Sequence, residues 1–204
     1  MRTYGGKTSE ERRADRRARL IEAALELFGA QGFAATSARA VLRQAGLIDR
    51  YFTESFAGME ELLAEVHDEI HNATFSAVAA AVDRTAEPAE QMRQMVDTIA
   101  RELERDPRAG RVKLIEVVGA GPLVETHRRR ALHQYTDATA ALLPPLPPDA
   151  SLNREALAAA VVAGINGLLE EWLTKSFDVS REQLVSHAVL LFRGVEQAMR
   201  EHTG

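Results

Sequence analysis

Arginine is the residue with the clearest potential chemistry in this sequence, and it is concentrated near the N-terminus. Five arginines fall within one short run: Arg12, Arg13, Arg16, Arg17 and Arg19. Guanidinium groups neutralise DNA phosphates without regard to base sequence, and such binding weakens as salt rises. The alternative is that these side chains only solvate the end of a helix. The run therefore indicates either a contact with nucleic acid or a charged helix terminus.

Histidine offers the second candidate chemistry. His67 and His71 are four residues apart, so one helix would carry both on one face, at a spacing that suits a metal ion. No third ligand accompanies them, so we expect polar or pocket-lining histidines, with no metal and no cofactor. The chain has no cysteine, which excludes disulfides and thiolate nucleophiles. It also has no phosphate loop or nucleophile elbow, so we expect no enzyme.

Composition and charge favour a helical protein with a basic N-terminal end. Hydrophobic residues make up 46% of the chain and aromatic residues only 5%, which is typical of a helical protein rich in Ala and Leu. Residues 1–57 contain ten Lys/Arg and seven Asp/Glu, a balance of +3, and residues 58–204 contain fifteen and twenty-three, a balance of −8. With no apolar run of about 18 residues and no secretory signal, we expect a cytoplasmic protein without a membrane partner.

The stretch from Thr36 to Phe56 is the element that would position the arginines. Its pattern predicts two short helices joined by a tight turn at residues 45–47, with Thr36 or Ser37 as the first N-cap. A preceding helix at 13–29 would pack across both, after a mobile arm at 1–11. Such a helix-turn-helix usually lays its second helix in the major groove of DNA.

The rest of the chain shows only helical periodicity, so the expected fold class is all-α. We expect an N-terminal three-helix helix-turn-helix domain at 1–57 and a C-terminal helical ligand-binding and dimerisation domain at 58–204. The expected helices of the second domain cover 59–82, 88–105, 108–118, 123–142, 151–175 and 181–201, with a proline-rich loop at 142–149. The last two helices have long apolar stripes, which favour a four-helix bundle across a dimer axis, although both stripes could instead pack within one chain.

Several short motifs follow in order through the first third of the chain. An apolar first helix ends in Phe28-Gly29, a Thr-Ser pair opens the second helix, and Ala-Gly-Leu forms the turn. YFTESF then begins at Tyr51, and MEELL begins at Met59. With this spacing, residues 17–66 resemble the DNA-binding domain of the tetracycline-repressor (TetR/AcrR) family of bacterial transcriptional regulators. The helical remainder resembles the rest of that family more loosely.

The resemblance implies DNA contacts from the second and third helices. The residues implied are Thr36, Ser37, Arg39, Arg43, Asp49, Arg50, Tyr51 and Thr53. Three positions depart from the family pattern. Thr53 and Met59 replace a Tyr and a Lys that contact phosphates in relatives, and Ile48 replaces the usual Ser/Thr cap of the third helix. Asp49 is then a candidate cap, a cytosine-reading acceptor or a neutral bystander. Fewer polar contacts would shift the binding to the arginines and Tyr51.

The resemblance also implies a ligand-gated C-terminal domain. The candidate ligand-binding residues are His67, His71, Met92, Met95, Glu116, Asn166, Glu170 and Trp172. The expected function is therefore a homodimeric DNA-binding transcriptional regulator, a repressor of a pseudo-palindromic double-stranded operator that an unknown small-molecule effector releases. The alternative is a small-molecule-binding helical protein with a degenerate DNA-reading head.

Overall fold

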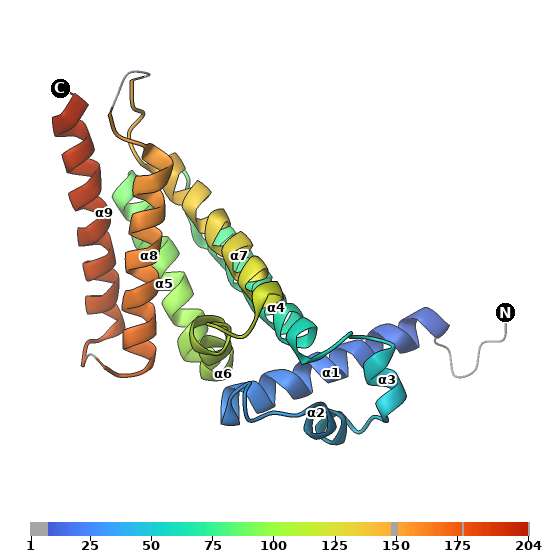
Figure 1. Ribbon diagram of the computed structural model, residues 1–204. Coiled ribbons are helices and arrows are strands. Elements are labelled where there is room, and N and C mark those ends of the chain that lie inside the picture. Colours follow the sequence, from blue (N-terminus) through green and yellow to red (C-terminus); the bar gives the residue numbers. More distant parts are fainter. Residues whose placement is uncertain (1–7, 148–150, 177, 204) are drawn as a thin grey trace.

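The computed structural model describes residues 8–147, 151–176 and 178–203, and every regular element within these ranges is helical. The elements are α1 (Ser9–Gln31), α2 (Ala38–Ala45), α3 (Asp49–Thr53), α4 (Met59–Ala81), α5 (Pro88–Arg105), α6 (Pro107–Arg111), the π-helical turn η1 (Val112–Glu116), α7 (Pro122–Leu142), α8 (Arg154–Leu173) and α9 (Arg181–Thr203). Helices α1–α3 form a small head at one end, and the later helices form a longer body (Figure 1). The expected all-α class, with a helix-turn-helix head and a helical body, is confirmed.

Helix α1 begins earlier than the sequence predicted, because Thr8 caps it. The Thr8 hydroxyl accepts a hydrogen bond from the backbone N–H of Glu11 at 3.1 Å, and the Glu11 carboxylate accepts one from the N–H of Thr8. This reciprocal pair satisfies two of the free N–H groups of the first turn. The prediction of a mobile arm is therefore wrong for residues 9–11, and residues 1–7 lie outside the described residues.

The turn between α2 and α3 depends on Gly46. Its φ of 63° and ψ of 40° lie in the left-handed region, which costs glycine little. Ser37 is the cap of α2, because its hydroxyl accepts from the N–H of Ala40 at 3.3 Å. At the start of α3, Ile48 holds the N-cap position and provides no side-chain hydrogen bond. The prediction that Asp49 caps this helix is therefore wrong, since Asp49 is its first helical residue.

Two hydrophobic clusters stabilise the molecule, and α4 contributes to both. The first cluster includes Phe28 of α1, Leu63 of α4 and Val112 of η1. The second fills the body and includes Val78 of α4 and Phe192 of α9. Burial of such side chains contributes roughly 1.5–3 kcal/mol each. The first cluster therefore joins the head to the body, and α4 connects it to the second cluster.

The sequence predicted one helix over 108–118, but the structure divides this segment. Helix α6 is followed directly by η1, in which the wider turn inserts an extra residue. A π-helical turn changes the directions in which the next side chains leave the backbone. Lys113 and Glu116 of η1 consequently extend into different parts of the molecule.

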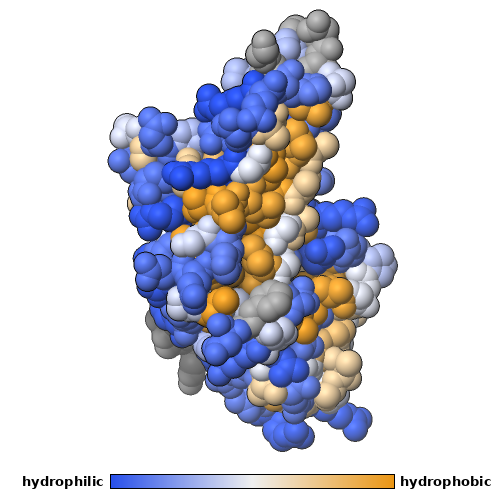
Figure 2. Space-filling model, turned by 90° about the vertical axis from the view of Figure 1, so that its left-hand side faces the viewer, coloured by the Kyte–Doolittle hydropathy of each residue, from blue (hydrophilic) through white to orange (hydrophobic). Residues whose placement is uncertain are grey.

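Helices α8 and α9 form the expected C-terminal hairpin. The backbone N–H of Ser180 donates to Gln183 Oε1 at 2.8 Å, and the N–H of Gln183 donates to Ser180 Oγ at 3.2 Å, which is the predicted capping box. The two helices pack closely at Gly164, where a Cβ would lie 2.7 Å from Leu191 Cδ2. Figure 2 shows an apolar band on this side of the molecule. Leu190 of α9 is 70% exposed.

Among the described residues, α8 is the one helix whose length and apolar composition would allow it to cross a membrane. No such segment was predicted from the sequence, because Asn166 interrupts the apolar part of this helix. Core and interface helices of water-soluble proteins pass the same test. Only 22% of the apolar window is buried within the chain, and Ala159, Ala160 and Ala163 are exposed. The exposed side of α8 is therefore a face of small apolar residues beside α9.

Candidate nucleic-acid interface and internal cavity

The surface of α2 and α3 presents most of the side chains expected to contact DNA. Ser37, Arg39, Arg43, Asp49, Arg50 and Thr53 are exposed, and Tyr51 is half-buried. Thr36 differs, because it is buried and its hydroxyl donates to the Gly32 carbonyl at 2.7 Å. The same hydroxyl accepts a hydrogen bond from Gln31 Nε2 at 3.1 Å. Thr36 therefore stabilises the start of α2 and does not belong with the exposed candidates.

Glu54 organises the arginines beside α3. Arg50 Nε donates to Glu54 Oε1 at 2.5 Å, and Arg16 Nη2 lies 3.9 Å from the other carboxylate oxygen. Arg13 Nη2 donates to the Glu54 carbonyl at 2.9 Å. The Arg16 guanidinium also stacks over the Tyr51 ring, 4.3 Å from its centroid. Helix α1 thus brings two arginines to the surface that contains Arg50.

Two of the five N-terminal arginines stabilise the head itself. The Arg17 guanidinium lies 4.3 Å from the centroid of the Phe56 ring and pairs with Glu65 Oε2 at 2.8 Å. Arg19 donates to the carbonyl of Ala45, at the turn after α2. Arg17 and Arg19 therefore make contacts within the head, whereas DNA contact by the arginine run stays a prediction.

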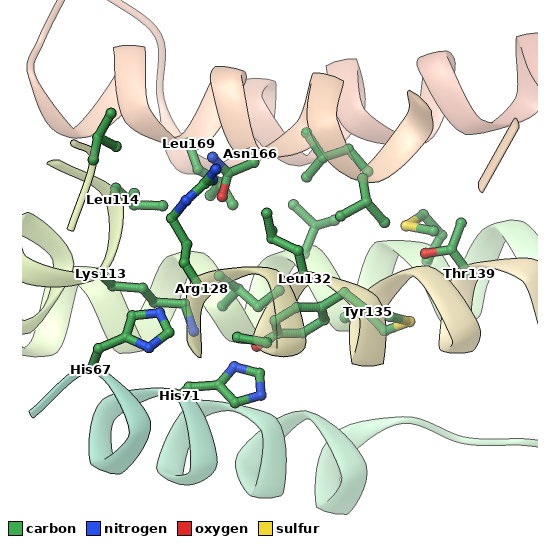
Figure 3. A pocket seen from close by; sticks show the side chains of 18 residues that line it. His67, His71, Lys113, Leu114, Arg128, Leu132, Tyr135, Thr139, Asn166 and Leu169 are labelled. Carbon is green, nitrogen blue, oxygen red and sulfur yellow. The ribbon is translucent and has the colours of Figure 1, made fainter. Parts of the chain in front are cut away.

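A cavity of about 60 Å³ lies inside the body, between α4, α5, η1, α7 and α8 (Figure 3). Its apolar lining consists of Met92, Met95, Val96, Ile99, Leu114, Val118, Ala131, Leu132, Val162, Ile165 and Leu169. Its polar lining consists of His67, His71, Lys113, Arg128, Tyr135, Thr139 and Asn166. An apolar cavity with a few polar groups is typical of a small-molecule site.

Four buried polar atoms at this cavity make no hydrogen bond: Lys113 Nζ, Tyr135 OH, His67 Nδ1 and His71 Nδ1. Lys113 Nζ lies 5.4 Å from the centroid of the Tyr135 ring, and the rings of His67 and His71 stack with centroids 6.3 Å apart. His67 Nδ1 lies 3.5 Å from Asp68 Oδ1, but without hydrogen-bond geometry. Unsatisfied buried polar groups cost roughly 1–3 kcal/mol each, so their concentration here points to a polar ligand.

Burial shifts the pKa of each of these groups towards its neutral form. It lowers the pKa of Lys113 to about 8. Burial, together with the charge of Lys113, lowers the pKa of His67 to about 4, and burial also lowers the pKa of His71. Burial raises the pKa of the Tyr135 hydroxyl. At neutral pH, this end of the cavity therefore contains neutral histidines, a neutral phenol and a mostly protonated amine.

The cavity includes five of the eight expected ligand-binding residues: His67, His71, Met92, Met95 and Asn166. Glu116, Glu170 and Trp172 lie outside its described lining. The Trp172 indole N–H instead donates to the Val179 carbonyl at 3.2 Å, beyond the end of α8. At the position before Glu170, Leu169 turns towards the cavity. Helical spacing places residues on one face, but it does not say where along the helix the cavity ends.

Lys113, Arg128 and Tyr135 were not expected from the sequence. Lys113 belongs to the largely apolar run at 112–118. A single lysine among apolar residues indicates a side chain whose amine is buried with them. Arg128 is paired, because its Nε donates to Glu125 Oε2 at 2.8 Å and its Nη2 to Glu125 Oε1 at 3.1 Å. The Lys113 stem is half-buried and its Nζ is shielded from solvent.

Glu116 connects η1 to the head. Its Oε2 accepts a hydrogen bond from the backbone N–H of Phe33 at 2.7 Å, and its Oε1 accepts one from Arg111 Nε at 2.8 Å. Phe33 belongs to the segment between α1 and α2, close to the exposed surface of α2. The η1 turn therefore touches the cavity through Lys113 and the head through Glu116.

The paired histidines form part of the cavity wall. No group of three or more His, Cys, Asp or Glu side chains in the described part of the chain could hold a metal ion. His71 Nε2 and Gln134 Oε1 are 2.6 Å apart. Since an amide oxygen only accepts, this hydrogen bond assigns the His71 proton to Nε2 and leaves Nδ1 as an acceptor.

Residues 20–66, from α1 to the first half of α4, match the family model for bacterial regulatory proteins of the tetR family. The head of this chain is therefore a DNA-binding domain of the tetR family of bacterial regulatory proteins. With this head, the chain is a DNA-binding transcriptional regulator. No curated protein matches the chain.

Solved structures share the fold of this tetR-family regulator over most of its length. A TetR-like transcriptional regulator from Rhodococcus sp. RHA1 is 19% identical, with a TM-score of 0.70 over 89% of this chain and 96% of that chain. The regulator FadR from Bacillus subtilis, in complex with stearoyl-CoA, is 14% identical, with a TM-score of 0.71 over 88% and 97%. The multidrug binding protein EbrR, complexed with imidazole, is 21% identical, with a TM-score of 0.71 over 94% and 97%.

Proposed function

We propose that this regulator binds a pseudo-palindromic DNA operator as a homodimer, and that a small-molecule effector in the internal cavity releases it. The observation that carries this proposal is the position of η1, which lines the cavity through Lys113 and holds Phe33 of the head through Glu116. A ligand changes DNA affinity only if it prefers one of two conformations. A ligand that displaces η1 would act directly on the segment before α2.

The proposed DNA-reading unit is residues 1–57, and 58–204 form the effector and dimer unit. Arg39 and Arg43 of α2 and Arg50 and Tyr51 of α3 are the side chains to which we assign DNA contact, because they surround the Gly46 turn and reach solvent. An arginine can bind guanine O6 and N7 with two hydrogen bonds. Arg13 and Arg16 would add phosphate contacts from α1.

The proposed dimer interface is the exposed apolar side of α8 and α9. Leu190 and Leu191 are 70% and 36% exposed, and the alanine-rich side of α8 lies beside them. A large, contiguous apolar patch on a water-soluble protein usually marks an interface. Two copies joined here would form a four-helix bundle and present two heads, which must meet major-groove sites about 34 Å apart or a multiple of it.

The effector role is supported by the cavity and by two proteins of the same fold. FadR was crystallised with stearoyl-CoA and EbrR with imidazole. We assign the effector to the cavity of this chain that contains His67, His71, Met92, Met95 and Asn166, and we place the regulator in the cytoplasm with no catalytic role. The bound and free forms would then differ in the geometry of η1 and the head.

The test is a band-shift assay of the full chain with DNA from upstream of its own gene, at two salt concentrations. We expect a specific complex that weakens as salt rises, and a mass in light scattering twice that of the chain. If neither this DNA nor a random-site selection yields a specific complex, the DNA-reading function is overturned. Tight ligand binding without any DNA affinity would instead favour a small-molecule-binding protein with a degenerate head.

A further inference from the structure

We propose that the effector is a compact organic carboxylate, whose carboxylate is held by the Lys113 amine and the Tyr135 hydroxyl while its apolar part fills the rest of the cavity. This inference rests on the proposed function, because it names the chemical class of the effector.

The charge of the cavity lacks a counterpart. Its described lining contains Lys113, Arg128 and two histidines, and no Asp or Glu. Arg128 donates two hydrogen bonds to Glu125, which also accepts one from Arg129, so the carboxylate is shared between two arginines. Lys113 Nζ has no described partner that is a carboxylate or another hydrogen-bond acceptor. Its described contact is a cation–π contact with Tyr135, whose ring centroid lies 5.4 Å away. A buried ammonium is costly unless it is paired, so an anionic ligand would supply the missing partner.

The unpaired donors also select the type of anion. Figure 3 shows the side chains of Lys113 and Tyr135 at the same end of the cavity as the rings of His67 and His71. One ammonium group and one phenolic O–H suit a monoanion with two acceptor oxygens. A phosphate dianion would bring twice the charge, against a single unpaired ammonium group. His71 Nδ1 is an acceptor, so it can accept from a hydroxyl on the ligand but not from the carboxylate itself.

The size and the remaining lining define the rest of the ligand. The cavity volume of about 60 Å³ corresponds to roughly four to six water-sized spheres at about 10–15 Å³ each. Beyond the polar end, its walls are formed by side chains such as Met92, Ile99, Leu132 and Ile165. Methionines adapt well to flat or irregular ligands. The enclosed part holds the carboxylate and a few carbon atoms, and the lining residue Val118 is 61% exposed, so we expect a single aromatic ring or a short aliphatic chain to extend towards this opening.

The test compares acids with their neutral amides on the purified full chain. Benzoate, phenylacetate and hexanoate are titrated by calorimetry beside benzamide, phenylacetamide and hexanamide, with wild type and three variants. Lys113→Met removes the cation, Tyr135→Phe removes only the hydroxyl, and Arg101→Met is a charge-matched control on the exposed side of α5. We expect at least one acid to bind wild type tenfold or more tightly than its amide.

The variants assign the selectivity to named groups. We expect Lys113→Met to lose at least tenfold in affinity for the acid with little change for the amide, Tyr135→Phe to lose severalfold, and Arg101→Met to bind as wild type. If Lys113→Met does not fold, two results test the proposal instead: the difference between acid and amide affinity in wild type, and the loss of acid affinity in Tyr135→Phe. Equal binding of acid and amide, no binding of any panel acid, or full acid binding by folded Lys113→Met would overturn the proposal.

One further measurement tests the carboxylate inference independently of the proposed function. The acid that binds best is added to the complex of the regulator with its DNA, and we expect DNA affinity to fall. Specific DNA binding without any acid binding overturns the carboxylate and leaves the regulator function intact. Acid-selective binding that leaves DNA affinity unchanged overturns the effector role of the carboxylate.

Discussion

Lys113 and Glu116 lie three residues apart in η1, and their side chains extend into different parts of the molecule. Lys113 ends in the internal cavity, whereas Glu116 accepts the backbone N–H of Phe33 in the head at 2.7 Å. A single π-helical turn therefore contacts both the internal cavity and the head. Because π-helical turns are strained and often occur at functional sites, this is the element at which we expect the two sites to communicate.

Removal of the Glu116 carboxylate should weaken the joint between head and body. In Glu116→Ala, the N–H of Phe33 loses its acceptor and Arg111 loses its partner, so we expect a loss of about 1–3 kcal/mol in the free energy of unfolding. Urea denaturation measures this loss. Glu90→Ala, which removes an exposed ion pair with Arg93, is the control and should cost much less, because solvent screens exposed pairs. Equal losses in the two variants would contradict a special role for Glu116.

Lys113→Met should stabilise the unliganded protein. The pKa of Lys113 is lowered to about 8 by burial, against about 10.4 in an unfolded chain. Below pH 8 Lys113 is protonated in both states, so the folded state bears the full cost of a buried charge, about 3 kcal/mol. Between pH 8 and 10 the folded state loses this proton while the unfolded state keeps it, so the cost disappears as the pH rises.

The measurement is the free energy of unfolding of both proteins between pH 7 and pH 10. The advantage of Lys113→Met should shrink as the pH rises, and Arg101→Met should show no such trend. The window ends at pH 10, since the raised pKa of Tyr135 begins to act above it. An advantage that is constant from pH 7 to 10 would show that Lys113 is not the titrating group.

His67 should make the protein sensitive to acid. Its pKa is lowered to about 4 by burial and by Lys113, with Asp68 acting in the opposite direction and His71 adding a smaller decrease. Stability is therefore lost as pH falls from 6.5 towards 4, because the unfolded state takes up a proton that the folded state resists, at a cost of about 3 kcal/mol. His67→Leu should lose less stability over this range in thermal melts, whereas His133→Leu, at an exposed site on α7, should follow wild type.

Arg50→Ala should relax sequence selectivity at one base pair of each half-site. If Arg50 reads a base edge, we expect a loss of about 1–3 kcal/mol with its preferred base pair and little change in the salt dependence. A phosphate contact would instead weaken every sequence equally and reduce the salt slope by about 1. Competition binding at several salt concentrations separates the two. Arg84→Ala, in the exposed turn before α5, controls for the loss of one charge.

Leu190→Asp should dissociate the homodimer. Leu190 is 70% exposed on α9, so the substitution leaves the core of the single chain intact, but it places a carboxylate in the proposed interface. Light scattering should show a monomer at micromolar concentration, and operator affinity should fall because each head then binds alone. Leu123→Asp, which is 40% exposed at the start of α7, should remain dimeric. A dimeric Leu190→Asp protein would place the interface elsewhere.

The fold could be predicted to this extent because helices depend largely on local features. The Ser180–Gln183 capping box, the left-handed Gly46 and the prolines that begin α5 and α7 are all signals within a few residues. The boundaries that were missed depend on distant contacts or on backbone detail. The start of α1 required recognition of Thr8 with Glu11, and no periodicity distinguishes η1 from an ordinary helical turn.

The sequence by itself determined the helix-turn-helix, the helical body and the family, because period, caps and turn glycines act over a few residues. Only the tertiary structure decided which side chains meet. It brought Lys113, Tyr135 and His67 from three separate elements to one cavity, and it turned Glu116 from an expected ligand contact into a link to Phe33. The physical reason is that the cost of a buried charge, or the strength of a hydrogen bond, depends on what packs around it from elsewhere in the chain.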